Sequence, residues 1–327
     1  MSIQTNPTVS QLQIKHPLKI IAGPDGIDHY NINEIYEIAN IEFNGKKAIF
    51  GTRTVGLKSR TGFDKNNTDK GFMGLDFDNI MRNFNVFGLG GTADDLKALP
   101  SVDMAAQIYK DTNMLCCTEL MLPAIQLACI AKSFKFKPFM VWNPAVDQLG
   151  WHIRQMAGFA QEYDWTIGLK NGKWIGEEYE LVETEEYDGK TSIETCWDGL
   201  VDYASIAPET VIINRGVDVP RKGIFRNLPI HHTAKRTKIR NLLAGKNIKC
   251  YFDPSHSLGP KMRDQIVAYT IEAMKTTIQV NGVELPLYDG ILIEVGTAKC
   301  DTHQHITVAE LRTMCEQLGE FRELVGR

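Results

Sequence analysis

Short apolar runs alternate along the chain with stretches whose apolar residues repeat at helical spacing, and this alternation restricts the fold most. Most of the eight runs are almost wholly apolar, as expected of strands buried on both faces of a parallel sheet. They are Leu18–Ala22, Ala48–Gly51, Met114–Thr118, Pro138–Trp142, Thr166–Leu169, Thr210–Ile213, Ile248–Phe252 and Gly290–Val295. Eight strand–helix units predict an α/β fold, a (β/α)8 TIM barrel. A doubly wound open sheet is the alternative, but no G-x-G-x-x-G follows the first run.

The helical stretches show regular apolar spacing. Ile266, Thr270 and Met274 fall on one face. The last helix opens with Thr307-x-x-Glu310, a capping-box pattern that satisfies the first free amide groups. Two further helices are expected over Ala124–Lys132 and Gln148–Tyr163.

Two segments interrupt the alternation. Lys173–Trp197 is acidic and carries Asp188-Gly189 at its centre, which predicts a β-hairpin inserted after the fifth run. Ile278–Leu287, with Asn281-Gly282 at its centre, predicts a second hairpin. We therefore expect an N-terminal extension over residues 1–17 and one catalytic barrel domain over residues 18–327, with the insert at about 173–197.

Composition excludes several classes of protein. The 327 residues are 43% hydrophobic and carry a formal charge of −4, whereas a nucleic-acid binder would normally show a basic excess. No apolar run approaches the ~20 residues that span a bilayer, and the polar start has no signal-peptide core. Seven cysteines without a C-x-x-C pair indicate reduced, packed thiols, so we expect a cytoplasmic protein without membrane or nucleic-acid partners.

Polar residues follow every apolar run. In a barrel the chemistry lies at the carboxyl ends of the strands, so these side chains are expected to converge. A charged or amide residue at each of these ends favours an enzyme. In chain order they include Asp25, Lys58, Arg60, Glu119, Asn143, Lys170, Asn171, Asn214, Arg215, Asp253, His256 and Glu294.

One subset of these residues has the chemistry of a metal site. The set is Asp25, His256, Glu294 and Asp301. One nitrogen and three carboxylates suit Mn²⁺, Mg²⁺ or Fe²⁺ better than a thiolate-selected metal. The structural alternatives are that Asp25 is a helix N-cap and that His256 caps the helix after it.

A second subset is cationic. It consists of Lys58, Arg60, Lys170, Arg215 and Arg226. Arginine forks match phosphate oxygens and lysine adds a point charge, so a metal beside these groups implies a phosphorylated substrate. Alternatively, Lys170 and Arg215 form a structural network with Glu119 or Asp253. Lys170 could also be the Schiff-base lysine of a class I aldolase, which would need a desolvated pocket.

The remaining histidines are interpreted as structural or solvated. His303 and His305 flank Gln304 and are expected in a solvated loop rather than as ligands. His231-His232 lies in a basic loop with Arg226, for which a solvated helix face is preferred over a lid that closes on a phosphate.

Several motifs together resemble one family. They are Ile20-Ile21-Ala22-Gly23-Pro24, Lys58-Ser59-Arg60-Thr61, Arg215-Gly216, Asp253-Pro254-Ser255-His256-Ser257 and Ile293-Glu294-Val295. In this order and spacing the chain resembles the metal-dependent type I 3-deoxy-D-arabino-heptulosonate 7-phosphate (DAHP) synthases. The resemblance runs from about Leu18 to the C-terminus and is strongest around residues 253–301.

The resemblance implies a (β/α)8 transferase of the shikimate pathway that joins phosphoenolpyruvate to erythrose 4-phosphate and releases phosphate. Its implied metal is Mn²⁺, with Mg²⁺, Fe²⁺ or Co²⁺ as alternatives, and its implied assembly is a dimer or tetramer. His256, Glu294 and Asp301 match metal ligands, and Lys170 and Arg215 match residues that hold phosphoenolpyruvate. The lysine of Lys58-Ser59-Arg60-Thr61 would face phosphoenolpyruvate, and Arg60-Thr61 the aldose phosphate. The match also implies that Asp253 and Glu119 are acidic residues near the reacting carbons.

The chain departs from this family at several positions. Asp25 stands where the family has Cys, and Gly296-Thr297 replaces a His-Pro segment. Pro144-Ala145-Val146-Asp147 replaces Gly-Ala-Arg-Asn, so a phosphate-binding arginine is missing and Ala145 keeps the place in the substrate-binding segment. Asn214 replaces a Glu. These changes leave three alternatives open: a synthase for another aldehyde, a 3-deoxy-octulosonate 8-phosphate type of enzyme, or a non-catalytic metabolite-binding barrel.

Overall fold

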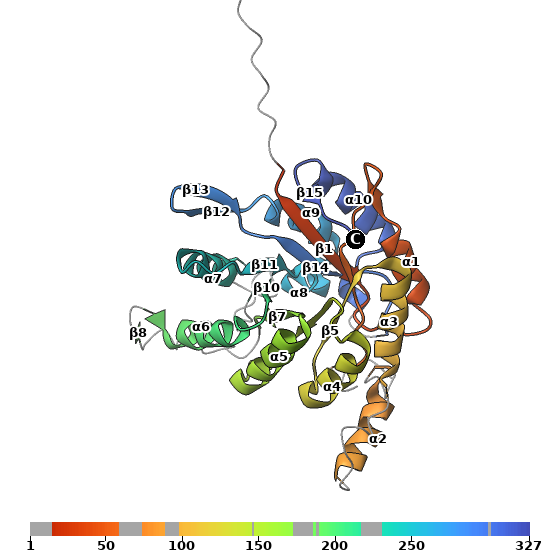
Figure 1. The fold of residues 1–327 in the computed structure, drawn as a ribbon. Coiled ribbons are helices and arrows are strands. Elements are labelled where there is room, and N and C mark those ends of the chain that lie inside the picture. The colour runs from red at the N-terminus through yellow and green to blue at the C-terminus, as the bar shows by residue number, and fades with distance from the viewer. Residues whose placement is uncertain are drawn as a thin grey trace, which may run out of the picture.

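Eight parallel strands close into a barrel. The computed structural model describes residues 15–58, 74–88, 98–145, 147–172, 186–187, 190–216, 231–299 and 302–327. The barrel strands are β1 (Pro17–Gly23), β4 (Gly51–Arg53), β5 (Leu115–Glu119), β6 (Phe139–Trp142), β7 (Thr166–Lys170), β10 (Glu209–Asn214), β11 (Lys249–Phe252) and β14 (Gly290–Glu294). Each pairs with its neighbour along the chain, β14 pairs with β1, and β15 (Glu323–Leu324) adds to the amino end of β1. The predicted (β/α)8 barrel is confirmed (Figure 1).

Helices surround this barrel. They are α1 (Ile32–Ala39), α2 (Phe77–Gly88), α3 (Pro100–Thr112), α4 (Pro123–Phe134), α5 (Gly150–Tyr163), α6 (Ser192–Ala204), α7 (His232–Leu243), α8 (Pro254–Leu258), α9 (Ile266–Ala273) and α10 (Val308–Gly319), with 3₁₀ turns at Pro260–Gln265 and Thr302–Gln304. Proline begins α3, α4 and α8, where its fixed φ suits the first turn and its missing N–H costs nothing. The predicted capping box is confirmed at the start of α10, where Thr307 and Glu310 bond each other's backbone amides.

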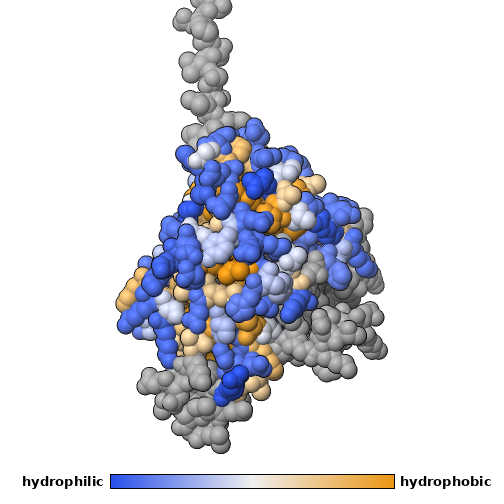
Figure 2. Space-filling view, turned by 90° about the vertical axis from the view of Figure 1, so that its right-hand side faces the viewer, coloured by the Kyte–Doolittle hydropathy of each residue, from blue (hydrophilic) through white to orange (hydrophobic). Residues whose placement is uncertain are grey.

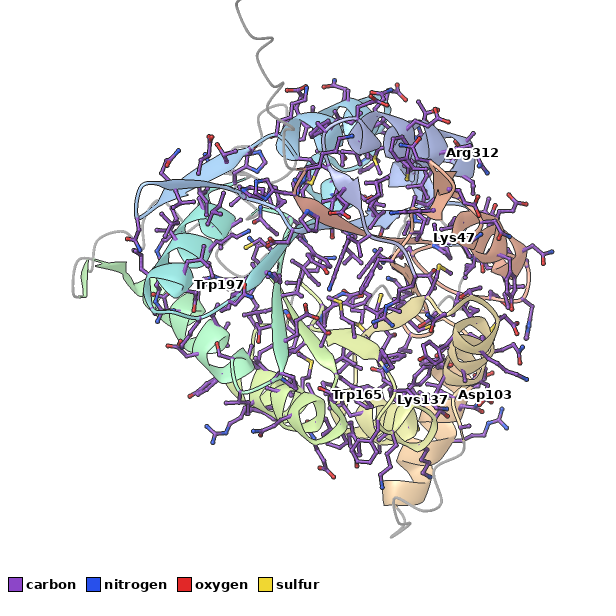
Figure 3. All side chains as sticks on the ribbon, turned by 45° about the horizontal axis from the view of Figure 1, so that its top comes forward. Lys47, Asp103, Lys137, Trp165, Trp197 and Arg312 are labelled. Carbon is purple, nitrogen blue, oxygen red and sulfur yellow. The ribbon has the colours of Figure 1, made fainter. Side chains whose placement is uncertain are left out.

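Both faces of the strands are apolar because successive side chains enter different cores. Ile21 points into the barrel core, whereas its neighbours Ile20 and Ala22 pack against the helices. Cys117 and Cys116 divide in the same way. Figure 3 shows the strand side chains filling the centre of the ring of helices. Five cysteines are buried free thiols, as predicted for them: Cys116, Cys117, Cys129, Cys250 and Cys315.

Among the described residues, three two-stranded sheets lie outside the barrel. β12 (Thr277–Val280) and β13 (Val283–Pro286) form the predicted second hairpin, with Asn281 and Gly282 both at positive φ. β8 (Glu186–Tyr187) pairs with β9 (Lys190–Thr191), whereas Asp188 and Gly189 lie outside the described residues. The chain becomes helical at Ser192. The predicted hairpin over Lys173–Trp197 was therefore too long: Trp197 lies in α6 and residues 173–185 are outside the described residues. The third hairpin is β2 (Glu42–Phe43) with β3 (Lys46–Lys47).

One face of the molecule is mostly polar where it is coloured in Figure 2. On the face in Figure 2, apolar side chains form small patches among hydrophilic ones. Among the described residues, no helix is both long and apolar enough to cross a membrane.

We predict that Glu310→Gln destabilises the fold by about 1 kcal/mol at pH 7, because it weakens both the cap of α10 and an exposed ion pair with Arg263. The Arg263 hydrogen bond lowers the pKa of Glu310 to about 2, from an ordinary 4.5. A lowered pKa stabilises the fold above pH 4.5 and loses this effect as the pH falls toward 2. Urea unfolding of both proteins at several pH values should show the difference shrinking below pH 4.5; a constant difference would contradict the assignment.

Candidate active site

Charged side chains from seven of the strand ends converge at the carboxyl end of the barrel. This set comprises Asp25, Arg53, Lys58, Glu119, Lys170, Arg215, Asp253, His256 and Glu294, of which all but His256 are buried. Barrel enzymes carry their chemistry at this end, because loops from different strands meet there. The region holds four carboxyl groups, two arginines and two lysines, so each buried charge has an opposite charge available.

Asp25 lies between two cations. Its Oδ1 accepts a hydrogen bond from Arg53 Nη2 at 2.8 Å and another from the Lys58 ammonium group. Lys58 also lies 3.6 Å from Glu119 Oε2. Burial alone would raise the pKa of Asp25, but Lys58 and Arg53 outweigh burial and hold this pKa well below its usual range. Asp25 is thus an ion-paired carboxylate and not a helix N-cap.

Glu294 is the carboxyl group on which most of the site converges. Its Oε1 lies 3.2 Å from Arg53 Nη2 and 3.4 Å from His256 Nε2, and its Oε2 accepts a 2.7 Å hydrogen bond from Gln304. Complete burial, reinforced by the negative charge of Asp25, raises the pKa of Glu294 well above 4.5. Glu294 is therefore a buried acid whose proton is readily retained while no further cation is present.

Lys170, Asp253 and His256 form a connected triad. Lys170 Nζ lies 2.8 Å from Asp253 Oδ2, and His256 Nδ1 donates to Asp253 Oδ1 at 2.9 Å. Asp253 is also the N-cap of α8, because its side chain accepts a hydrogen bond from the His256 amide. Burial would raise the pKa of Asp253, but His256 and Lys170 outweigh it and keep this pKa well below its usual range. Lys170 is therefore the buried ion-pair partner of Asp253.

Desolvation favours the neutral form of both imidazoles in the site. Burial lowers the pKa of His256 to about 3 and that of His305 to about 4. His305 Nδ1 donates to the Gly296 carbonyl at 2.8 Å, and its Nε2 lies 3.7 Å from Glu294 Oε2. The prediction of a solvated loop is correct for His303, which is exposed, and wrong for His305, which is 5% exposed.

Three asparagines fix the strand ends around the charges. Asn143 donates to the Lys170 carbonyl and accepts from its amide, at 3.0 and 2.8 Å. Asn171 accepts from the Arg215 amide and donates to Asn214, both at 2.8 Å. These bonds hold the backbone beneath Lys170 and Arg215 in place.

The predicted metal ligands come together only in part. Asp25 and His256 both lie beside Glu294, whose Oε1 has no hydrogen-bond partner among the described groups. Asp301 is outside the described residues. Among the described side chains, no group of three His, Cys, Asp or Glu residues is arranged to hold a metal ion. The donor chemistry nevertheless suits a divalent cation, because Glu294 Oε1 and His305 Nε2 are buried without a hydrogen-bond partner among the described groups. The metal therefore stays a prediction.

The other predicted site residues are placed as follows. Ala145 is buried beside the end of β6, in close contact with Gly172 after β7. Arg60, Thr61 and Arg226 lie outside the described residues. Arg53 was missed, because the second strand was predicted to end at Gly51 and instead spans Gly51–Arg53.

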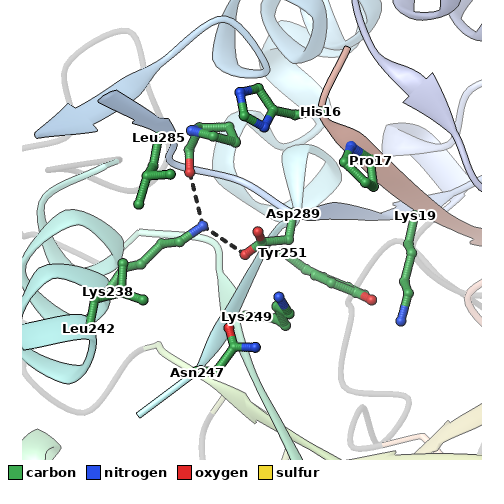
Figure 4. A pocket seen from close by; sticks show the side chains of 11 residues that line it. His16, Pro17, Lys19, Lys238, Leu242, Asn247, Lys249, Tyr251, Leu285 and Asp289 are labelled. Carbon is green, nitrogen blue, oxygen red and sulfur yellow. Dashed lines mark hydrogen bonds and ion pairs between the residues drawn. The ribbon is translucent and has the colours of Figure 1, made fainter. Parts of the chain in front are cut away.

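A cavity of about 300 Å³ lies at the opposite, amino end of the strands, between α7 and the β12–β13 hairpin (Figure 4). Its central cation, Lys238, is satisfied by Asp289 and by the carbonyls of Pro286 and Leu287. This end of a barrel typically serves stability, so the carboxyl-end cluster remains the candidate site.

Comparisons with known proteins support the fold. No protein-family model matches the sequence, and no curated protein sequence matches it. Among solved structures, the chain is similar to phospho-2-dehydro-3-deoxyheptonate aldolase (DAHP synthase) from Thermotoga maritima. The match has a TM-score of 0.58 at 14% identity and covers 93% of this chain and 68% of that one. At this identity the likeness establishes a shared barrel fold.

We predict that Lys170→Met destabilises the protein by about 3–5 kcal/mol, because it leaves the Asp253 carboxylate buried without its ammonium partner. The double variant Lys170→Met/Asp253→Asn should recover part of this loss, since both charges are then removed. Denaturant unfolding of the four proteins in this cycle measures the coupling. Strictly additive effects would show that the two groups do not depend on each other.

Proposed function

We propose that the chain catalyses a phosphoenolpyruvate-dependent aldol condensation with an aldose phosphate. The first candidate is erythrose 4-phosphate, which would give DAHP and inorganic phosphate. The observation that carries this proposal is the buried cluster of Lys58, Lys170 and Arg215 beside four carboxyl groups at the carboxyl end of a barrel. Such a cluster suits substrates that carry several negative charges.

The residues have distinct roles in the proposed reaction. Lys170 and Arg215 hold phosphoenolpyruvate, while Lys58 neutralises it from the other side of the site. Positioning two anions together supplies much of the rate enhancement, because it replaces an encounter in solution. The enol carbon bonds to the aldehyde carbon, whose oxygen takes a proton. Water then adds to the cationic carbon and loses a proton toward Glu119 or Asp253. The new hydroxyl gives up its proton as the bond from this carbon to the phosphate oxygen breaks, which leaves a ketone and releases inorganic phosphate. The two protons of the water thus end on the hydroxyl formed from the aldehyde and on phosphate.

A divalent cation, with Mn²⁺ as the first candidate, would be held by His256 and Glu294 together with Asp25 or Asp301. When bound, it would supply a Lewis acid for the aldehyde carbonyl. The proposal also retains a cytoplasmic location and a homo-oligomer as predictions.

Another aldehyde is the second candidate function. The segment Pro144-Ala145-Val146-Asp147 lacks the phosphate-binding arginine that the family resemblance implies. Without that cation, an unphosphorylated or differently placed aldehyde becomes a candidate partner for phosphoenolpyruvate.

We expect the purified protein to release inorganic phosphate from phosphoenolpyruvate when erythrose 4-phosphate and Mn²⁺ are added. A panel with arabinose 5-phosphate and unphosphorylated aldoses separates the two candidate functions. Mass spectrometry of the product identifies the new carbon–carbon bond. If no aldehyde supports phosphate release, with or without metal, the catalytic proposal fails.

We predict that Arg215→Ala weakens phosphoenolpyruvate binding by more than tenfold, because a charge-assisted hydrogen bond is worth ~1.5–3 kcal/mol. Arg236→Ala is the matched control: Arg236 pairs with Asp198, joining α7 to α6 away from the strand ends. Isothermal titration of each protein with phosphoenolpyruvate measures the change. Equal affinities in the two variants would remove Arg215 from the binding site.

A further inference from the structure

His305 presents an unused nitrogen lone pair inside the candidate site. Its Nδ1 must donate the ring proton to the Gly296 carbonyl, which can only accept, so the neutral ring keeps its lone pair on Nε2. That Nε2 is buried and has no hydrogen-bond partner among the described groups. A buried acceptor without a donor is costly, which indicates that a cation or a proton donor belongs beside it.

The Gly296 carbonyl holds the His305 ring so that Nε2 lies near Glu294. Gly296 has a φ of 86°, which favours glycine, and a Cβ there would approach Glu34 Oε2 to 2.5 Å. Glu34 in turn accepts hydrogen bonds from the Thr297 amide and hydroxyl. The carbonyl that orients His305 is therefore fixed.

His256 makes the same kind of approach from the other side. Its Nδ1 is held by Asp253, and its Nε2 lies 3.4 Å from Glu294 Oε1, whereas His305 Nε2 lies 3.7 Å from Oε2. Histidine ligands of metals characteristically donate the second ring nitrogen to a carboxylate or a backbone carbonyl, as both rings do here. Asp25, by contrast, is already ion-paired with Arg53 and Lys58.

We propose that His305 is a further ligand of a divalent cation at this site. Binding would draw the two imidazoles, His256 and His305, and the Glu294 carboxylate together around the cation, since no three such side chains among the described residues are arranged to hold one in its absence. Two histidines and one carboxylate are a donor set typical of Fe²⁺, and imidazole also favours Co²⁺ and Zn²⁺ over Mg²⁺. This inference deepens the proposed function by assigning the class of metal, but its cation-binding part does not depend on which reaction the protein catalyses.

The test is Co²⁺ binding to the full-length protein after dialysis against chelator, followed by visible absorption and isothermal titration. We expect His305→Gln to bind Co²⁺ about 10–100-fold more weakly than the wild type. His303→Gln, two positions away and exposed, is the matched control and should bind like the wild type. Wild-type protein that binds no Co²⁺, or His305→Gln that binds as tightly as His303→Gln, would overturn the proposal.

A second measurement uses only the wild type, so its result does not depend on whether His305→Gln folds correctly. X-ray absorption at the cobalt edge distinguishes two imidazole ligands from one, and one would overturn the assignment of His305. Phosphate release is measured separately on the same preparations. Cobalt binding that depends on His305 without phosphate release would uphold this inference while the proposed reaction failed.

Discussion

The pairing of β1 with β14 is the interaction on which the candidate site depends. Gly23 lies opposite Glu294 in this parallel pair, and the Val295 amide donates to the Gly23 carbonyl at 2.9 Å. This closure brings Asp25, two residues beyond Gly23, beside a carboxyl group that lies near the other end of the chain. An open sheet would leave the two acids at opposite edges, so closure of the barrel is a condition for the chemistry as well as for the fold.

Closure also concentrates buried charge, and the cations of the site must stabilise the fold before they bind anything. Arg53 contacts both Asp25 and Glu294, and Lys170 contacts Asp253. Only one Arg53 nitrogen, Nη2, has a hydrogen bond, whereas Nε and Nη1 have no partner among the described groups. Arg322 differs, since all three of its nitrogens donate to backbone carbonyls. Arg322 is a structural arginine, whereas Arg53 keeps donors that a water or substrate oxygen would satisfy.

The sequence predicted the barrel because both of its cores leave a repeated pattern of apolar residues. It also predicted the strand-end residues, since the carboxyl ends of parallel strands meet on one side. Arg53 was not predicted, because a long charged residue usually marks the end of a buried strand. Here Arg53 is the last residue of the strand, and its ion pairs allow its charge to be buried. His305 escaped because the burial of a loop residue depends on contacts with Gly296 and Glu294, which no local periodicity encodes. The start of α6 was missed for a similar reason. Trp197 of α6 packs against α7 and donates a hydrogen bond to Thr237, and the local sequence does not encode this distant contact.

The protonation of Glu294 connects anion binding to cation binding. While Glu294 keeps its proton, the site has a surplus of positive charge, which favours an anionic substrate. A divalent cation binds the ionised carboxylate, so cation binding would release the proton of Glu294. The proton carries one positive charge and the cation two, so the net charge of the site would rise by one. An anion bound by Lys170 and Arg215 would then raise the affinity for the cation, and by thermodynamic linkage the cation would raise the affinity for the anion to the same degree. In such a site each ligand would bind more tightly when the other is present.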